Sequence, residues 1–320
     1  MSDTTTDGPV LDVQGLTFSY RHTRALTDAT FSVSTGSIHG FVGPNGAGKT
    51  TTLKILATLL KPKAGSVRVL GRDIVRRYKA VRRSIGYMPD HFGLYRQMTV
   101  FESLDFFGAA YGLGRKQREA VIDDILTLVD LKGRRAGLVG SLSRGMLQRL
   151  SLGRALVHDP KLLLLDEPAS GLDPRARIEL MEILRELSRM GKTIFISSHI
   201  LGELADLCDS VTIIDRGMIK YSGSMADLLA QRSGTANYVL VLDEADGDVE
   251  EKLKSLDGVL AVARGDGLSA YRFSFDTEVT DTNALLRAAL DAGWHVRSFK
   301  EDTRKLSEAF MELTEPGVPL

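Results

Sequence analysis

A glycine-rich segment with one lysine and one hydroxyl residue is the part of the sequence best suited to chemistry. Gly43 to Thr50 reads GPNGAGKT, which fits the pattern G-x-x-x-x-G-K-[ST] at every fixed position. Its glycines permit backbone conformations in which successive N–H groups point inward around an anion. Lys49 would reach the β- and γ-phosphates of a nucleoside triphosphate, and the Thr50 hydroxyl would bind Mg²⁺. The predicted nucleotide-binding residues are Gly43, Pro44, Asn45, Gly46, Ala47, Gly48, Lys49, Thr50 and Thr51.

The elements that a phosphate-binding loop requires flank this segment. The apolar run Ile38 to Val42 predicts a strand that enters the loop, and Thr51 to Leu60 predicts a helix that leaves it. The helix would add its positive N-terminal end to the anion site. A glycine-rich turn that merely precedes a lysine is the alternative, but strand, loop and helix in this order favour nucleotide binding.

Two adjacent carboxylates follow a second apolar run. Leu162 to Glu167 reads LLLLDE, which predicts a buried strand that delivers acidic groups to the ligand-binding edge of an α/β sheet. Asp166 is suited to hold Mg²⁺, and Glu167 to polarise the attacking water as general base. Alone, such a pair would favour a helix cap or a solvated turn. With the phosphate-binding loop present, it predicts catalysis.

The composition bounds the class of protein. At 320 residues the chain is long enough for a large domain and a smaller companion, and its 41 basic and 41 acidic residues cancel. This balance disfavours a surface that neutralises nucleic-acid phosphates, so we expect no nucleic acid partner. The single cysteine, Cys208, is expected to be a small buried hydrophobe in a reducing compartment. The absence of a long apolar run and of a signal-peptide pattern predicts a chain that is soluble by itself.

Alternating strand-like and helical patterns predict an α/β domain over residues 10–230, after a disordered leader at residues 1–9. Short apolar strands are expected at Leu162 to Leu165, Thr193 to Ser197 and Val211 to Asp215, with helical stretches between them. This alternation is typical of parallel strands buried on both faces. Between about residues 91 and 155 the pattern becomes helical, which predicts a helical insertion.

A second, smaller domain is expected after a polar joint at Ala230 to Ala236. Residues 237–320 show short strands and helices in the order β-α-β-β-α-β, which predicts a ferredoxin-like α+β domain. Tyr271, Phe273 and Phe275 alternate with smaller or polar residues in one of its strands. A half-buried strand face explains this alternation better than an aromatic binding site. We assign no chemistry to this domain.

Several short motifs, taken with the phosphate-binding loop, resemble those of one family. Tyr20, in FSY, matches an aromatic residue on which adenine stacks, and Leu142 to Gln148, LSRGMLQ, resembles the signature LSGGQ at a helix N-terminus. Ser170 to Asp173, SGLD, resembles a loop that crosses a dimer interface, and His199 matches a histidine that contacts the γ-phosphate. In this order, from Val10 to Ser224, they make the chain similar to the nucleotide-binding subunit of an ATP-binding-cassette (ABC) transporter.

The resemblance implies a fold, a reaction and a dimer. The fold would be α/β, a P-loop NTPase of the ABC type with a helical subdomain, and the reaction would be ATP hydrolysis with ATP and Mg²⁺ bound. Ser143 and Gly145 of the signature would contact the γ-phosphate held by an opposing subunit, and His199 would orient the water with Glu167. ATP would close a dimer with a second copy or a related ATPase subunit, and hydrolysis would reopen it.

The resemblance also implies a separate integral-membrane permease, which would place the chain at the cytoplasmic face of the cell membrane. The segment SEAFMELT, Ser307 to Thr314, resembles exporter subunits for drugs, antibiotics, ions and polysaccharides, so export is favoured over uptake. Phe92 and Tyr95 are hypothesised to line a groove for the permease, with ordinary packing as the alternative. The basic run Arg72 to Arg83 is interpreted as a solvated helix face in preference to a lipid-binding one.

Two places depart from the family pattern. Asp90 stands where glutamine is usual; its carboxylate would still bind Mg²⁺ or its water, and an ordinary turn aspartate is the alternative. Arg144 and Met146 replace a glycine and a glutamine of the signature, which bears on the hydrolytic rate more than on nucleotide binding. The predicted metal ligands are Thr50, Asp90 and Asp166. Two other functions stay open, a soluble ABC ATPase outside transport and a nucleotide-gated regulatory module with little hydrolysis.

Overall fold

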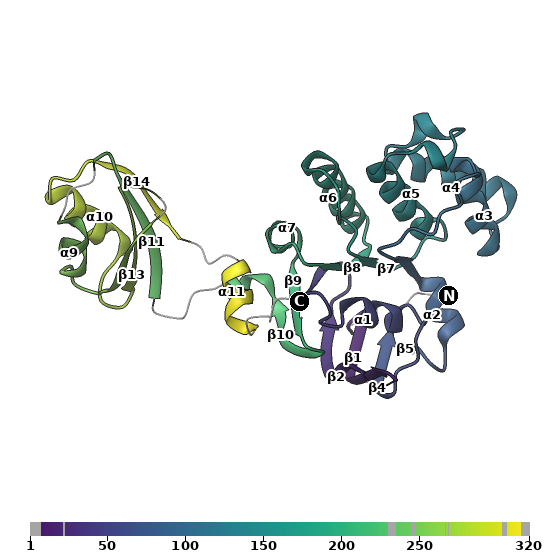
Figure 1. Ribbon diagram of the computed structural model, residues 1–320, viewed down its shortest axis with the longest axis horizontal. Helices are drawn as coiled ribbons and strands as arrows, with labels where there is room; N and C mark the ends of the chain where they lie inside the picture. Colours follow the sequence, from purple (N-terminus) through teal and green to yellow (C-terminus); the bar gives the residue numbers. More distant parts are fainter. Residues whose placement is uncertain are drawn as a thin grey trace. The chain divides into compact units, whose positions relative to one another are not determined.

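The computed structural model describes residues 8–21, 23–229, 235–244, 248–265, 267, 269–302 and 306–314. Contacts group these residues into two compact units, one within Met1–Ala226 and Phe310–Leu320 and one within Asp227–Ala309. Figure 1 shows the helices and strands of both. Residues 1–7 of the predicted leader and 230–234 of the predicted joint lie outside the described residues. The domain limits 10–230 and 237–320 stay a prediction.

Two β-sheets form the first unit. The antiparallel sheet has the order β2-β1-β4-β5, with β1 (Leu11–Tyr20), β2 (Thr23–Val33), β4 (Ala64–Val69) and β5 (Arg72–Asp73). The other sheet has the order β10-β9-β3-β8-β7-β6, with β3 (Ile38–Val42), β6 (Ile85–Met88), β7 (Leu162–Asp166), β8 (Thr193–Ser198), β9 (Ser210–Asp215) and β10 (Met218–Ser224). All its pairings are parallel except that of β10. Every residue of β3, β7 and β8 is buried, which confirms the prediction of parallel strands buried on both faces.

Helices connect and cover these strands. Outside the predicted insertion they are α1 (Lys49–Leu56), α2 (Tyr78–Ser84), α6 (Pro174–Arg189), α7 (Leu201–Leu207) and α8 (Met225–Leu229). The insertion contains α3 (Val100–Ala110), α4 (Arg115–Leu128), the short turns Lys132–Arg134 and Val139–Ser141, and α5 (Arg144–Leu156). The interpretation of Arg72 to Arg83 as one helix face is wrong, because Arg72 belongs to β5 and α2 begins only at Tyr78.

The helix after the phosphate-binding loop begins earlier than the sequence pattern predicts. It starts at Lys49 instead of Thr51 because Gly48, with a φ of +111°, turns the chain directly from the loop into the helix. It ends at Leu56 instead of Leu60, and Thr58 then takes a left-handed φ of +61°. Lys49 and Thr50 therefore lie in the first turn, at the positive end of the helix dipole.

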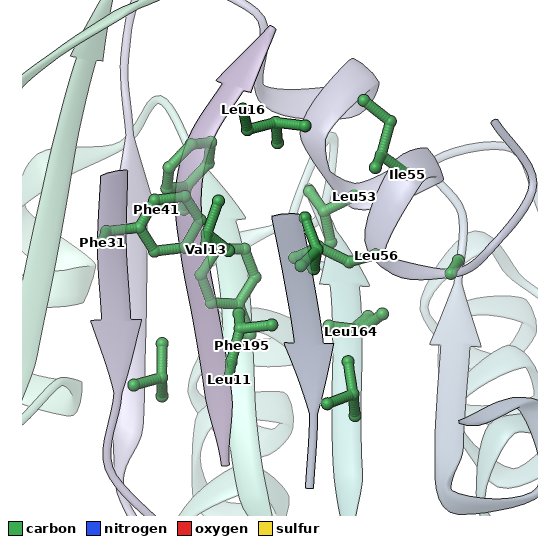
Figure 2. Packing of buried hydrophobic residues seen from close by; sticks show 14 of the residues in the cluster. Leu11, Val13, Leu16, Phe31, Phe41, Leu53, Ile55, Leu56, Leu164 and Phe195 are labelled. Atoms are coloured by element: carbon green, nitrogen blue, oxygen red, sulfur yellow. The ribbon is translucent and has the colours of Figure 1, made fainter. Parts of the chain in front are cut away.

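A cluster of buried aromatic rings lies in the core that the strand and helix on either side of the loop share with the other strands of the first unit. The ring of Phe41 in β3 lies 5.5 Å from that of Phe31 in β2 and 5.2 Å from that of Phe195 in β8. Figure 2 shows these rings in the same core as Leu53 of α1 and Leu164 of β7. Because interiors are close-packed, this core holds the strand and helix around the loop in fixed positions against β7 and β8.

The second unit is a small α+β sandwich (Figure 1). Its elements are β11 (Thr235–Leu242), α9 (Val249–Lys254), β12 (Val259–Arg264), β13 (Ala270–Asp276), α10 (Thr282–Asp291) and β14 (Val296–Glu301). The antiparallel sheet order β12-β13-β11-β14 is that of a ferredoxin-like unit, as predicted. Tyr271, Phe273 and Phe275 are buried in its core, which favours packing over aromatic binding. The helix α11 (Leu306–Leu313) contains most of the SEAFMELT segment.

A buried histidine in the first unit predicts that its stability falls in acid. The ring of His39, in β3, lies 2.7 Å from the Ser210 hydroxyl and 2.8 Å from that of Thr212. Burial lowers the pKa of His39 from 6.5 to about 3. The unfolded chain would take up this proton below pH 6.5 and the folded unit would not. We expect the free energy of unfolding to fall as the pH is lowered from 6.5 toward 3, by about 1.4 kcal/mol per pH unit.

Urea unfolding at pH 7.5 and pH 5.5 measures this effect. A His39→Gln variant, which keeps polar contacts to the two hydroxyls but carries no titrating ring, is the control and should lose less stability between these pH values. Equal losses in both proteins would contradict a buried neutral His39.

Candidate nucleotide-binding and catalytic site

The loop from Gly43 to Thr50 can adopt its path only because of its glycines. A Cβ at Gly43 would lie 2.3 Å from the Ile214 carbonyl oxygen, and one at Gly48 would lie 2.8 Å from that of Ala25. Gly46 and Gly48 have φ values of +79° and +111°, in the region that favours glycine. The loop therefore packs against the ends of β2 and β9 with its backbone.

Lys49 is held at the centre of the loop. Its side chain is 6% exposed, and Nζ donates to the carbonyl oxygens of Gly43 at 2.7 Å and Pro44 at 3.3 Å. The same ammonium lies 3.4 Å from Oε1 of Glu167. A desolvated cation with such partners attracts an anion strongly, because little water screens it.

Asp166, at the end of β7, joins the loop to the neighbouring strand. Its Oδ1 accepts hydrogen bonds from the Thr50 hydroxyl at 3.2 Å and the Ser197 hydroxyl at 2.8 Å. Burial raises the pKa of Asp166, the two hydroxyl hydrogen bonds oppose this rise, and the negative charges of Glu167 and Asp90 add to it. A cation beside Asp166 would relieve the cost of its buried charge.

The donors around Asp166 suit Mg²⁺, which takes hydroxyl and carboxylate oxygens and keeps several waters. In the described residues, no three His, Cys, Asp or Glu side chains are grouped as a metal site. The Thr50 hydroxyl and the Asp166 carboxylate, directly or through water, fit an ion that draws its other ligands from phosphates and water. Asp90, the third predicted ligand, stays a prediction.

Glu167 is oriented by contacts on three sides. Its backbone takes a left-handed φ of +49°, and its N–H donates to the Ser197 hydroxyl at 3.0 Å. Its Oε2 lies 2.7 Å from Nδ1 of His199, and its Oε1 faces Lys49. Since an ionised carboxylate only accepts hydrogen bonds, this contact requires a proton on Nδ1 of His199. A non-glycine residue in this conformation persists only where the surroundings hold it, which is common at functional sites.

One open cavity of about 390 Å³ gathers most of the predicted side chains. Its lining is Ala25, Asn45, Gly46, Gly48, Lys49, Thr50, Thr51, Asp90, Glu167, Ser170 and His199. This volume is in the range of small-molecule sites. The structure therefore brings residues of the loop, Glu167, His199 and Asp90 to one place.

Asp90 reaches this cavity from the end of β6. Its carboxylate is 42% exposed and lies 3.1 Å from Nδ1 of His91. Burial is the main cause of the raised pKa of Asp166, and the negative charge of Asp90 is a smaller contribution after that of Glu167. The position is therefore part of the site, whether or not Asp90 binds metal.

Other predicted residues lie outside the cavity lining. Tyr20 is 45% exposed, with its ring edge-on to Phe18 at 4.9 Å. Ser143 caps α5 by accepting from the Met146 N–H at 3.3 Å, which confirms the helix start expected at the signature. A Cβ at Gly145 would lie 3.3 Å from Cβ of Ala176. The nucleotide-binding roles of Tyr20, Ser143 and Gly145 stay predictions. The same holds for Gly43, Pro44 and Ala47, whose backbone forms part of the loop.

The sequence interpretation missed Ser197 and Ala25, and it named Ser170 only within the SGLD segment that resembles a loop at a dimer interface. Ser197 bonds both Asp166 and the Glu167 N–H, and its place at the end of β8, just before His199, was an available signal. Ser170 opens the SGLD segment and lines the cavity. Ala25 lines it through the approach of β2 to the loop, for which the sequence carries no signal.

None of the helices in the described part of the chain has both the length and the apolar composition that a bilayer-spanning helix needs.

Known proteins are similar to this chain in sequence and in fold. The ABC transporter family model matches residues 26–170. The "Uncharacterized ABC transporter ATP-binding protein YxlF" of Bacillus subtilis (strain 168) is 34% identical over 307 residues, which cover 95% of this chain and 99% of that protein. The "Nod factor export ATP-binding protein I" of Rhizobium sp. (strain N33) is 32% identical over 304 residues, 95% of this chain and 96% of that protein.

A solved "Structure of ATP binding subunit of ABC transporter" aligns with a TM-score of 0.62 and 33% identity over 68% of this chain and 91% of that one. ABC ATPases act with permease subunits, through which they associate with a membrane, and they dimerise. The similarity along nearly the whole length confirms the predicted family, fold class and reaction. The chain belongs to the ATP-binding subunits of ABC transporters, and it is an ATPase that hydrolyses ATP to energise such a transporter.

Proposed function

We propose that this subunit hydrolyses Mg²⁺-bound ATP in the 390 Å³ cavity, with Glu167 as general base. The observation that carries the proposal is the position of the Glu167 carboxylate, between His199 at 2.7 Å and Lys49 at 3.4 Å. A base held in this way can accept the proton of an attacking water while the lysine faces the phosphates.

The other residues of the site have separate tasks. Lys49 and the N–H groups of the loop bind the β- and γ-phosphates, and Tyr20 stacks on adenine. Mg²⁺, when bound by Thr50 and Asp166, supplies positive charge that neutralises the phosphate oxygens. Ser197 orients the Asp166 carboxylate and the Glu167 backbone through its two hydrogen bonds. His199 holds the Glu167 carboxylate through Nδ1 and contacts the γ-phosphate.

The complete site requires a second subunit, which is another copy of this chain or a related ATPase subunit. Ser143 and Gly145 lie at the N-terminus of α5, a helix of 13 residues, but outside the cavity of their own chain. The N–H groups and dipole at this helix end suit a phosphate presented by the opposing subunit. ATP then joins two chains, and loss of the γ-phosphate releases them.

The closing and reopening of this dimer drive export through a separate permease, to which the subunit binds at the cytoplasmic face of the cell membrane. The name "Nod factor export ATP-binding protein I", printed for a relative 32% identical over 304 residues, supports the export direction. The SEAFMELT segment in α11 supports the same branch. The equal numbers of basic and acidic residues give no support for a nucleic acid partner.

Membrane vesicles that hold the subunit with its permease test this proposal. ATP turnover should require Mg²⁺, stop with EDTA and return with added Mg²⁺. In inside-out vesicles the chain should be accessible to external ATP and protease, and in right-side-out vesicles it should be protected. Turnover in EDTA would contradict the Mg²⁺ site, and protease access in right-side-out vesicles would contradict the cytoplasmic location.

We propose that the permease groove is a second cavity, lined by residues other than Phe92 and Tyr95. This cavity has a volume of about 310 Å³ and is lined by Ala57, Leu59, Arg82, Ile85, Tyr87, Phe107, Tyr111, Arg154, Ala155 and His158. Neither Phe92 nor Tyr95 lines it, although the Phe92 carbonyl accepts from Arg154 at 2.7 Å. Leu59 and Tyr111, at its rim, are 57% and 42% exposed. Exposed apolar side chains at a cavity suit an inserted helix.

Leu59→Ala combined with Tyr111→Ala should reduce copurification of the permease about tenfold, because anchoring residues in a pocket carry most of the binding free energy. The matched double variant Phe92→Ala with Tyr95→Ala should reduce it less. A larger loss of copurification in the Phe92→Ala with Tyr95→Ala variant would instead favour a groove lined by Phe92 and Tyr95. Thermal melting of both double variants shows whether the fold is retained.

Replacing Asp90 with alanine is expected to lower ATP turnover about tenfold, because groups that support a metal site typically cost this much when removed. Asp90→Gln, which restores the residue usual in the family, should retain more activity than Asp90→Ala. Steady-state ATPase assays of the permease complex measure both. Unchanged turnover and unchanged coupling in Asp90→Ala would identify Asp90 as an ordinary turn residue.

A further inference from the structure

Arg144 connects the signature helix to the segment that follows the catalytic carboxylate. It is the first residue of α5, at a position where the family signature usually has glycine. Its guanidinium donates to the Ser170 carbonyl oxygen at 2.9 Å, across 26 residues of sequence. It also covers Gly171, since a Cβ there would lie 2.5 Å from the guanidinium carbon.

The segment that Arg144 contacts is the turn that carries Glu167. The Ser170 N–H donates to the Glu167 carbonyl oxygen at 3.0 Å and closes this turn, with Pro168 in its second position. Glu167 has a φ of +49°, which a non-glycine residue rarely adopts, and Gly171 has a φ of +68°, which suits glycine. Ser170 also lines the nucleotide cavity. A hydrogen bond to the Ser170 carbonyl oxygen can therefore restrict the movement of this turn.

The backbone of α5 lies close to the same segment. A Cβ at Gly145 would lie 3.3 Å from Cβ of Ala176 and 3.7 Å from a methyl carbon of Leu172. Asp173 caps α6 by accepting from the Ala176 N–H at 2.9 Å. The chain from Ser170 to the first turn of α6 thus packs against the start of α5, and Arg144 adds a hydrogen bond to this contact.

We propose that Arg144 is a positioning residue for ATP hydrolysis. By holding the Ser170 carbonyl, it fixes the turn that orients the Glu167 carboxylate, and it transmits displacements of the helical insertion to that carboxylate. A glycine at this position has no side chain to make the bond. The role rests on the proposed function of Glu167 as general base. Among the described hydrogen bonds and ion pairs, Arg144 bonds the Ser170 carbonyl and makes none with the loop from Gly43 to Thr50 of its own chain. We therefore expect its removal to lower turnover more than it lowers the affinity of that loop for ATP.

Arg144→Met tests this role in the complex with the permease. Methionine keeps the apolar stem and the helix propensity but donates no hydrogen bond. We expect kcat to fall about tenfold, equivalent to about 1.4 kcal/mol, with the KM for ATP within about twofold of the unaltered chain. Arg144→Lys should recover most of kcat, because an ammonium also donates to a carbonyl. Arg115→Met, at an arginine 86% exposed in α4, is the matched control and should leave kcat unchanged.

Two kinetic results for Arg144→Met would overturn the proposal. One is an unchanged kcat in Arg144→Met, and the other is a rise in KM that parallels the fall in kcat, which indicates nucleotide binding instead of positioning. Equal losses in Arg144→Met and Arg144→Lys would count against the hydrogen bond as well. Should Arg144→Met fail to fold, as thermal melting would reveal, Arg144→Gly takes its place under the same criteria, since glycine is usual at this position.

Hydrogen exchange separates this proposal from the proposed function. The Ser170 amide, which closes the Glu167 turn, should exchange faster in Arg144→Met than in the unaltered chain, and this readout needs no ATPase activity. A chain that hydrolysed no ATP would contradict the proposed role of Glu167 as general base. Unchanged exchange of the Ser170 amide in Arg144→Met would contradict only the proposed role of Arg144.

Discussion

Replacing Glu167 with glutamine is expected to reduce ATP turnover by at least about 100-fold, because the amide cannot accept the proton of the attacking water. The change conserves size, and the amide oxygen can still accept the hydrogen bond from Nδ1 of His199, which is 2.7 Å long in the unaltered chain. The variant also loses a negative charge close to the bound phosphates, so the repulsion between the site and ATP falls. ATP should therefore stay bound, and the ATP-bound dimer should accumulate.

Steady-state ATPase assays measure the loss of turnover, and light scattering after size-exclusion chromatography with and without ATP measures the dimer. Glu186→Gln removes a carboxylate of α6 that is 51% exposed and paired with Arg189, and it should leave both properties unchanged. Unchanged turnover in Glu167→Gln would remove Glu167 from the role of base. A dimer that forms equally well without ATP would contradict nucleotide-driven closure.

Replacing Lys49 with methionine is expected to weaken ATP binding about 100-fold, equivalent to about 2.7 kcal/mol. Methionine fills a similar volume, but it provides no charge and no donor for the phosphates. The side chain is 6% exposed, so solvent screens its charge little and cannot replace it. The variant also leaves Glu167 without its cation at 3.4 Å, so its negative charge repels the nucleotide without compensation.

Equilibrium titration with a fluorescent ATP analogue measures this affinity. Lys54→Met, on the same helix α1 but outside the cavity lining, is the matched control and should bind ATP like the unaltered chain. An affinity of Lys49→Met within about threefold of the control would contradict a phosphate-binding role for Lys49.

The loop, the acidic pair and the order of the elements were predictable because each depends on short stretches of sequence. The spacing of glycines 43, 46 and 48 encodes the loop directly, since each marks a close approach or a positive φ. The run Leu162 to Asp166 has the apolar composition that a strand buried on both faces requires. The ferredoxin-like order of the second unit followed from alternating patterns in the same way.

The contacts that orient the candidate catalytic groups were not predictable in this way. Thr50 and Asp166 are 116 residues apart, and their hydrogen bond exists because parallel pairing of β7 and β8 and packing of α1 bring them together. The same packing of distant elements brings Ser197 and Ala25 to the site. The contact of Arg144 with Ser170 depends on how the helical insertion lies against α6, which local patterns do not specify.

By itself, the sequence determined which chemical groups this subunit offers to a nucleotide, because residue type and local spacing decide what a loop or a strand end can bind. Only the tertiary structure decided how these groups face one another. It placed Glu167 between Lys49 and His199, and it linked the turn that begins at Glu167 to the first residue of α5. The physical reason is that such distances are set by the packing of elements far apart in the chain, where many weak contacts act together and no short motif records the result.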